Sequence, residues 1–367
     1  MSVDVQLTAP SGPWHVRGVV LPDGDRSCDW WIVDGHLTDE LVAGASDLPG
    51  AWVLPGGLVD AHTHLTMNFG HAMPHADGSD DLIAANGAAQ LRAGVLALRD
   101  AGHAWGGVPR ECPDGPRLQR AGSLIAPPGR GYSNVCRLVP EHDLVAVALE
   151  EVAAGAGWVK VLGDFPGPDG NWFAAPSNYS RQVLTALVRE VHAAGARVLG
   201  HSTGLGAEDL VAAGVDSVEH GMALSSDLIA EMADRGIAWT CTLATALKHV
   251  GALCEQPTPV GAYVRAQFDR LREQLPHAAA SGVPLLAGTD EIPMGAIWRE
   301  LQHLGEFGLN PAQALGAGSV KARAWLGFPA VGPGGSADLV TFDADPRRDL
   351  SALARPAAVL MAGRRVA

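Results

Sequence analysis

Short apolar runs alternate with alanine-rich amphipathic stretches through the middle of the chain. The stretches SRQVLTALVREVHAAG and SSDLIAEMADRG carry apolar residues at helical spacing and end at glycine, which predicts helices. The short apolar runs between such stretches predict strands. These runs lie at Leu58–His62, Val95–Asp100, Leu118–Ile125, Val159–Gly163, Val198–Ser202, Ser217–His220, Ala238–Leu243 and Pro284–Thr289.

Eight strands that alternate with helices are typical of an α/β protein with a (β/α)8 TIM barrel, which we assign to residues 58–331. The structural alternative is a doubly wound open sheet. That fold predicts a glycine-rich phosphate turn after the first strand. The sequence has His62-Thr63-His64 at this place, which favours the barrel.

Both ends of the chain have a different pattern, in which short β-rich segments are separated by turn residues. VDVQL, WHVRGVVL and WWIVDGHL lie within residues 1–57, and SADLVTFDAD and AAVLMAGRRVA lie within residues 332–367. We expect the two ends to form one small β-sandwich-like domain, whose strands meet after the middle has folded. The length of 367 residues fits a barrel of roughly 250 residues with such an addition.

The balance of charge narrows the choice of partners. The chain has 26 Lys and Arg against 40 Asp and Glu, a formal net charge of −14, and no basic run. Nucleic acid and anionic membranes are therefore disfavoured. No segment approaches the roughly 20 uninterrupted apolar residues of a membrane helix, and the N-terminus lacks the features of a signal peptide. We expect a cytoplasmic protein that acts on a small molecule; a homo-oligomer is compatible with the sequence, which does not specify it.

Six residues with metal-ligating or acid–base side chains lie in or just after these predicted strands: His62, His64, Lys160, His201, His220 and Asp290. The C-terminal ends of barrel strands converge on one face, so these residues are expected to meet in space. His62 and His64 are two apart on an extended strand and point the same way, which makes them a chelating pair. Two hydrogen-bonded structural histidines are the alternative.

Lys160 lies inside the apolar strand GWVKVLGD. Burial disfavours a charged ammonium, so this side chain needs a partner or a lowered pKa. A neutral amine near two metals can react with CO2 to form a carbamate, whose two oxygens can bridge both ions. The alternatives are an ion pair with Asp164 or extension of the side chain to the barrel rim.

His201 ends RVLGHSTG, His220 ends DSVEHG, and Asp290 ends PLLAGTD. Two histidines at consecutive strand ends, with His-x-His upstream, favour metal ligation over a structural role. A carboxylate at the last strand can bind a metal through one oxygen and take a proton from metal-bound water through the other. Metal coordination lowers the pKa of that water from about 15.7 to about 7. A helix cap is the alternative for Asp290.

Together, PGGLVDAHTHLTM, GWVKVLG, VLGHSTG, DSVEHG and LLAGTD resemble the amidohydrolase superfamily. The most similar subgroup is the imidazolonepropionase-like amidohydrolases, which include metal-dependent Xaa-Pro dipeptidases. The resemblance covers nearly the whole chain and implies two divalent ions, most simply zinc, with manganese or iron as alternatives. It implies His62, His64 and Asp290 on one ion, His201 and His220 on the other, and carboxylated Lys160 as the bridge. It also implies Asp290 as the proton shuttle.

Two segments depart from the subgroup. Its His-Ala-His-Gly is His201-Ser202-Thr203-Gly204 here, and PPGRGYSN stands where a Gly-Gly-His segment helps polarise the carbonyl. Candidate substrate-binding residues are His103, Arg130, Tyr132 and Trp172.

We expect metal-activated hydroxide to cleave a C–N bond in a small amide, cyclic amide, carbamate or dipeptide-like molecule. A deaminase on the same fold is the first alternative, and it would have a single metal and an unmodified Lys160. A non-catalytic binding protein is the second, and it should have lost one or more of the six ligand positions.

Overall fold

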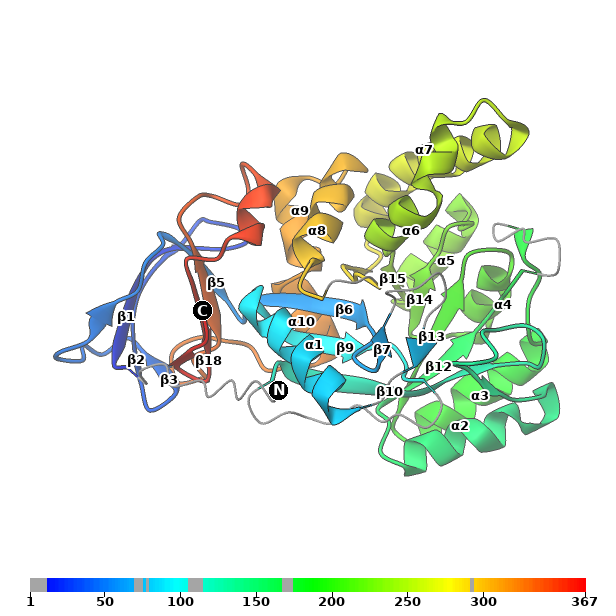
Figure 1. The fold of residues 1–367 in the computed structure, drawn as a ribbon, viewed down its shortest axis with the longest axis horizontal. Coiled ribbons are helices and arrows are strands. Elements are labelled where there is room, and N and C mark those ends of the chain that lie inside the picture. The colour runs from blue at the N-terminus through cyan, green and yellow to red at the C-terminus, as the bar shows by residue number, and fades with distance from the viewer. Residues whose placement is uncertain (1–11, 69–74, 77–78, 105–114, 167–173, 291–293) are drawn as a thin grey trace.

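A computed structural model describes residues 12–68, 75–76, 79–104, 115–166, 174–290 and 294–367. It consists of a barrel ringed by helices and a second, smaller β domain beside it (Figure 1). The barrel confirms the (β/α)8 prediction.

Eight parallel strands form the barrel, and each of the predicted apolar runs supplies one of them. They are β6 (Leu58–Thr63), β9 (Val95–Asp100), β10 (Arg117–Ala126), β12 (Trp158–Leu162), β13 (Arg197–Ser202), β14 (Ser217–His220), β15 (Ala238–Thr240) and β16 (Leu285–Leu286). The sheet has the order β16-β15-β14-β13-β12-β10-β9-β6. Backbone hydrogen bonds of 2.8 Å from Ala61 N to Ala287 O and from Asp290 N to His62 O link its two edges. The sheet is therefore nearly closed.

The last two strands are shorter than predicted. Residues 241–243 leave β15 and turn into a helix, because Thr242 adopts a left-handed backbone. Strand β16 ends at Leu286; after it, Ala287 N donates to Ala317 O and Thr289 N to Asp60 Oδ1. The chain after β16 is thus held by the end of α9, by the side chain of Asp60 and by the backbone of β6.

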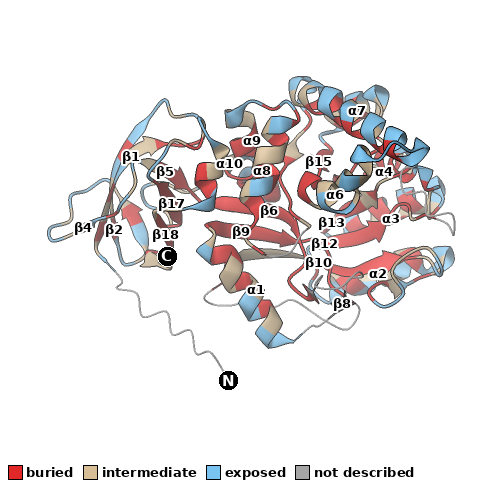
Figure 2. Cartoon of the chain, turned by 45° about the horizontal axis from the view of Figure 1, so that its top comes forward, coloured by how far each residue is buried: buried red, intermediate tan, exposed pale blue. Residues whose placement is uncertain are grey.

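The barrel helices are α1 (Asp80–Arg92), α2 (Leu144–Ala153), α3 (Arg181–Ala193), α4 (Gly206–Ala213), α5 (Ser226–Arg235), α6 (Leu243–Val250), α7 (Pro259–Ser281), α8 (Ile297–Glu306), α9 (Pro311–Ala317) and α10 (Val320–Leu326). Ser180 and Ser225 cap the N-termini of α3 and α5 with their side chains, and Gly236 ends α5 in a left-handed conformation, as its sequence pattern predicts. The strands are buried and the outer faces of the helices are exposed (Figure 2).

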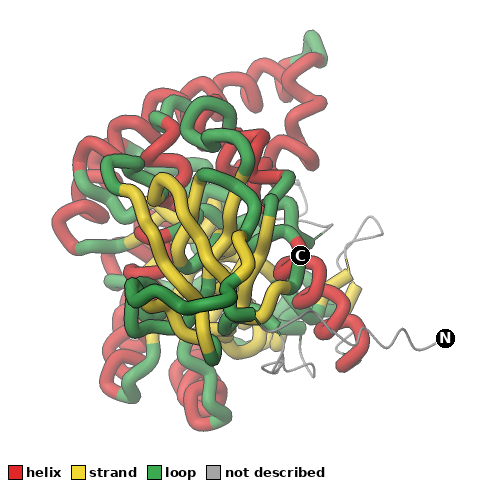
Figure 3. Tube along the Cα trace, turned by 90° about the vertical axis from the view of Figure 1, so that its left-hand side faces the viewer, coloured by secondary structure: helices red, strands yellow, loops and turns green. Residues whose placement is uncertain are grey.

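The second domain is a mixed sheet built from both ends of the chain, as predicted, although the segment VDVQL lies outside the described residues. Its main strands are β1 (Trp14–Val20), β2 (Ser27–Val33), β3 (His36–Thr38), β5 (Trp52–Pro55), β17 (Leu339–Phe342), β18 (Ala358–Met361) and β19 (Arg364–Arg365). Their order is β19-β18-β17-β5-β1-β2-β3, so the antiparallel β5–β17 pair joins the two chain ends. Seen from the side of this domain, its strands lie in front of the barrel helices (Figure 3).

A buried ion network joins the two domains. Asp338, next to β17, accepts hydrogen bonds from Arg117 Nε of β10 at 2.6 Å and from Arg323 of α10 at 3.4 Å. Ser336 Oγ and Ala362 N also donate to it, at 2.9 and 3.0 Å.

The described part of the chain contains no helix that is both long and apolar enough to cross a membrane.

Candidate metal centre

Three of the predicted ligands meet at the C-terminal end of the barrel. His62 is in β6, His64 directly follows β6, and Asp290 follows β16. One ligand atom from each residue lies within 4.8 Å of the other two. Asp290 Oδ1 is 3.1 Å from His64 Nε2 and 3.8 Å from His62 Nε2. In the described ranges, no other three His, Cys, Asp or Glu side chains have ligand atoms that all lie within 4.8 Å of one another.

His220 and His201 extend this cluster from the ends of β14 and β13. The ring of His220 lies 5.1 Å from that of His62, and the ring of His201 lies 4.5 Å from that of His220. His62 and His64 are themselves 5.2 Å apart, edge to face. Four imidazoles from three strands are therefore contiguous, as expected where parallel strands end together.

The other ring nitrogen of three of these histidines is held by a second group. His64 Nδ1 donates to the carbonyl of Gly102 at 2.6 Å, and His62 Nδ1 donates to Glu219 Oε2 at 2.5 Å. His220 Nδ1 lies 2.6 Å from Thr242 Oγ1. Such contacts fix the orientation of an imidazole and, where Nδ1 carries the proton, present Nε2 as the ligand atom.

Two buried nitrogen atoms in the cluster are unsatisfied. Lys160 Nζ and His201 Nε2 have no hydrogen-bond partner among the residues that the structure describes. Lys160 lies in the middle of β12 and is 2% exposed, so water does not compensate it. Buried polar atoms without partners are rare in folded proteins, and each needs an explanation.

Asp164, the sequence-based alternative partner for Lys160, is engaged elsewhere. Its carboxylate accepts from Ser202 Oγ, from Thr203 N at 3.0 Å and from Gly204 N at 3.1 Å. The segment that replaces the subgroup's His-Ala-His-Gly begins at His201. The buried carboxylate of Asp164 thus holds the three residues of this segment that follow His201. The ion pair between Lys160 and Asp164, which the sequence left open as an alternative, does not form, because the carboxylate faces this loop.

Burial favours the neutral form of His62 and His220. It lowers the pKa of His62 to about 4, with the charge of Lys160 as the second cause. It also lowers the pKa of His220 to about 3, against the opposing charge of Asp290. Burial also acts to lower the pKa of His64, but the hydrogen bond with Asp290 and the charge of Asp290 outweigh burial and raise this pKa. Neutral imidazole is the form that binds metals.

Burial and neighbouring charges also shift the pKa values of Lys160 and Asp290 at the centre. It lowers the pKa of Lys160 to about 8, although the charges of Glu219 and Asp290 act in the opposite direction. For Asp290, burial acts upward, but the charges of His62 and His64 and the hydrogen bond to His64 hold its pKa well below the usual range. The site therefore pairs a carboxylate with an amine whose neutral form is favoured relative to that of an exposed lysine.

Sequence reasoning missed a layer of charged residues beneath the histidines. Glu219 of β14, which orients His62, accepts a second hydrogen bond from Arg99 of β9 at 2.8 Å. Burial alone would raise the pKa of Glu219, but the charges of Arg99 and His62 reverse this and hold it low. The signal was present in the sequence, since both residues interrupt apolar runs as Lys160 does.

Asp60 of β6 is a further missed residue. It is fully buried and accepts from Thr289 N at 3.0 Å, Thr289 Oγ1 at 2.7 Å and Gln90 Nε2 at 3.1 Å. It therefore fixes the residue before Asp290 against the strand that carries His62. Burial, opposed by these hydrogen bonds, raises the pKa of Asp60 to about 6.

The predicted substrate-binding residues have different surroundings. Tyr132 packs edge-on against Phe165 with ring centroids 5.1 Å apart, and burial, followed by the negative charge of Asp290, raises its pKa. His103 is buried, with Nδ1 3.0 Å from Ala104 O. Arg130 donates to Asn178 Oδ1 at 3.2 Å and to a backbone carbonyl, so it joins two loops. Trp172 lies outside the described residues.

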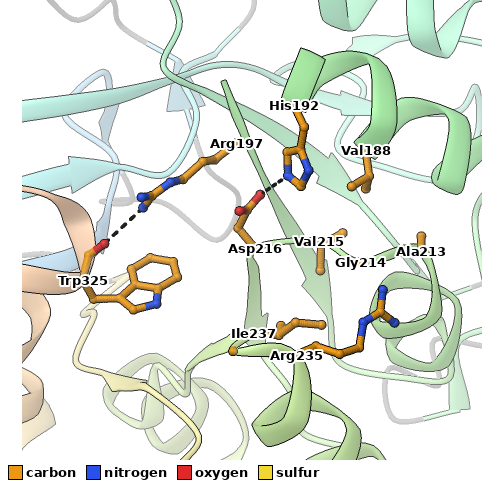
Figure 4. Close-up of a pocket in the computed structure, with 11 residues that line it drawn as sticks. Val188, His192, Arg197, Ala213, Gly214, Val215, Asp216, Arg235, Ile237 and Trp325 are labelled. Atoms are coloured by element: carbon orange, nitrogen blue, oxygen red, sulfur yellow. Dashed lines mark hydrogen bonds and ion pairs between the residues drawn. The ribbon is translucent and has the colours of Figure 1, made fainter. Parts of the chain in front are cut away.

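The opposite end of the barrel holds a cavity of about 550 Å³ with charged walls (Figure 4). Asp216 accepts from His192 Nε2 and from Val198 N, both at 2.8 Å. Arg197 donates to the carbonyl of Trp325 at 3.1 Å. These polar groups satisfy one another, in contrast to those at the mouth, and active sites of such barrels lie at the C-terminal end.

A (β/α)8 barrel with a histidine and aspartate cluster at its mouth and a sheet domain from both termini has the architecture expected of amidohydrolases. The sequence matches the Amidohydrolase family over residues 52–366, most of the chain. The protein therefore belongs to the amidohydrolase family and, with it, to the hydrolases. The resemblance inferred from the motifs is confirmed.

Relatives extend over almost the whole chain. An uncharacterized protein of Mycobacterium tuberculosis is 36% identical over 364 residues, which cover 95% of each chain. A Xaa-Pro dipeptidase crystallised with methionine in its active site has a TM-score of 0.77 at 19% identity, covering 96% of this chain and 98% of the other. Ochratoxinase of A. niger has the same TM-score at 18% identity, covering 96% and 95%. At these identities the two structures establish a shared fold.

Proposed function

We propose that this protein is a metal-dependent hydrolase that cleaves a C–N bond of a small amide, cyclic amide, carbamate or dipeptide-like molecule. Membership of the amidohydrolase family supports hydrolysis. The observation that carries the proposal is the cluster of four contiguous imidazoles with Asp290, next to the unpartnered Lys160 Nζ.

The donor set fits divalent metals. Imidazole and carboxylate ligands suit zinc, and also manganese or iron. His62, His64 and Asp290 would hold one ion, and His201 and His220 a second. The unpartnered His201 Nε2 supports this assignment, because a metal would satisfy a buried nitrogen that no described residue satisfies.

Lys160 would bridge the two ions as a carbamate. Its neutral amine attacks the carbon of CO2, a new N–C bond forms, one C–O π pair moves onto oxygen, and the amine loses a proton to water. Burial and a lowered pKa support this step, because the unprotonated amine is the nucleophile. The product is an anion with two ligand oxygens, which suits a position between two cations better than an ammonium does.

Divalent metals, when bound, would polarise the scissile carbonyl and make water more acidic. Asp290 would accept the proton of the attacking water and deliver it to the leaving nitrogen. Both histidine contacts of Asp290 involve Oδ1, which leaves Oδ2 for the proton. Its side chain is 18% exposed, whereas that of His62 is 1% exposed, so Asp290 is open to a substrate. Tyr132, near enough for the charge of Asp290 to raise its pKa, would border the bound molecule.

The decisive experiment is metal analysis of the purified protein and of Lys160→Ala, followed by a screen of N-acyl amino acids, dipeptides and lactams. We expect about two metals per chain in the wild type and fewer in the variant, with a sharp loss of turnover. Chelation should abolish activity, and added zinc or manganese should restore it. Full turnover after exhaustive metal removal would contradict the proposal. One metal beside an unmodified Lys160 would favour a deaminase.

A further inference from the structure

Three strand ends at the mouth share an uncommon backbone conformation. His220, Thr242 and Asp290 have φ values of +67°, +52° and +46°. His220 is the last residue of β14, whereas Thr242 and Asp290 lie two and four residues after β15 and β16. They are three of the five non-glycine residues with positive φ in the described part of the chain. Residues with side chains rarely adopt this region unless their surroundings enforce it. Contacts from other parts of the structure must therefore hold the backbone of these three residues in this conformation.

The first turn of helix α6 supplies contacts to two of them. Thr242, directly before the helix, places Oγ1 2.6 Å from His220 Nδ1. Thr245, in its first turn, donates from Oγ1 to the backbone carbonyl of Asp290 at 2.8 Å. One short helix thus touches a predicted ligand of each metal, once through a side chain and once through the backbone.

The start of α6 is itself held from another helix. Thr242 makes no side-chain cap, and its left-handed backbone turns the chain sharply into the helix. Instead, Glu300 of α8 accepts from Leu243 N through Oε1 at 3.0 Å and from Ala244 N through Oε2 at 2.7 Å. Glu300 is fully buried, so these two bonds are not exchanged for water. An acid from a distant part of the chain replaces the usual N-cap.

We propose that Glu300 is a positioning residue for the metal centre: by clamping the N-terminus of α6, it sets His220 and Asp290 through Thr242 and Thr245. The inference rests on the proposed function, because it assumes that His220 and Asp290 bind metal. Glu300 lies on α8, the next helix in the chain after Asp290, and Thr245 of α6 supplies the contact to the Asp290 backbone.

The test compares Zn²⁺ binding by metal-depleted, full-length wild type and Glu300→Gln. The glutamine keeps the volume and one acceptor, but its NH2 group would face a backbone N–H. We expect about 10–100-fold weaker Zn²⁺ binding, the scale for groups that orient ligands. In turnover, kcat should fall more than KM rises. Unchanged Zn²⁺ affinity in the folded variant would overturn the inference.

A matched control separates positioning from packing. Glu151 is also a buried helical acid; it accepts from Ser123 N at 3.1 Å and from Arg137 at 2.9 Å, neither of which is a predicted ligand. Glu151→Gln should lower thermal stability and leave Zn²⁺ affinity unchanged. Equal losses of affinity in both variants would mean that Glu300 acts only through general stability.

A double-mutant cycle tests the route through α6. Thr245→Val removes one hydrogen bond to Asp290 from a half-buried site and keeps the side-chain shape. If Glu300 acts through α6, the effects of Thr245→Val and Glu300→Gln on Zn²⁺ affinity should be non-additive. Additive effects would overturn the route. If the wild type binds no metal at all, the proposed function fails instead, which keeps the two failures apart.

Discussion

Two groups of buried charges, one at the domain junction and one at the barrel mouth, differ in how far their polar atoms are satisfied. At the junction, Asp338 accepts from two arginines, a serine and a backbone N–H. At the mouth, Glu219 and Asp60 are equally well bonded, but Lys160 Nζ, His201 Nε2 and Arg99 Nη1 have no partner among the described residues. Both groups are centred on buried carboxylates, although the side chain of Arg117 at the junction is 33% exposed.

The difference separates a structural network from a site. In a complete network each charge is compensated where it lies, so the removal of one partner destabilises the fold. An incomplete one leaves desolvated atoms uncompensated, and such groups are retained where function requires them. Changes at the junction should therefore affect stability without affecting chemistry, and changes at the mouth should do the reverse.

The largest effect is expected at the junction. Asp338→Asn leaves Arg117 and Arg323 without their carboxylate and should lower the free energy of unfolding by about 3–5 kcal/mol. Denaturant titration measures this, and kcat of the folded variant should stay near that of the wild type. Asp269→Asn, which removes an exposed pair with Arg272, should change stability by less than about 1 kcal/mol. A large loss of kcat with little change in the free energy of unfolding would mean that the junction acts as a site and not as a structural network.

This effect should depend on pH. Burial acts to raise the pKa of Asp338, but its hydrogen bond with Arg117 and further contacts outweigh this and lower it. A lowered pKa in the folded state gives stability that is present above the unfolded pKa, about 3.9. The difference between wild type and Asp338→Asn should therefore shrink as the pH falls below this value.

At the mouth, Asp290→Asn should keep the fold and most bound metal but lower kcat at least about 100-fold, the scale of general acid–base catalysis. The amide still offers an oxygen to a metal, yet it cannot accept a proton from water. Single-turnover kinetics and metal analysis of the same sample measure both effects. Turnover near the wild-type rate would mean that Asp290 acts only as a metal ligand and not as the proton acceptor.

The smallest effect is expected at an exposed cluster in the β domain. His15 contacts Asp29 at 2.7 Å and Asp47 at 2.6 Å, and these hydrogen bonds raise its pKa. Its contribution should be fully present below about pH 6.5 and lost as the pH rises through the raised pKa. His15→Gln should cost about 1 kcal/mol or less at pH 6, since both acids are exposed. An equal cost at pH 6 and pH 9 would contradict this assignment.

Much of the barrel could be predicted because local pattern and tertiary environment agree there. Strands such as β9 and β14 are buried on both sides, so each has an apolar run that ends where the chain turns. The ends of β15 and β16 could not be predicted, because Thr242 turns away into α6 and Thr289 bonds to Asp60. Apolar residues continue beyond both strands, and nothing local marks the change.

By itself the sequence determined that His62, His64, His201, His220 and Asp290 would gather, because parallel strands in a closed sheet must end on the same face. Only the tertiary structure decided which groups orient them. Glu219 is 157 residues from His62, and Glu300 is 57 residues from Leu243. Contacts of this kind depend on strand register and on how two helices pack, to within fractions of an ångström. Periodicity in the sequence specifies which face a residue occupies, but not which distant donor lies within hydrogen-bond reach.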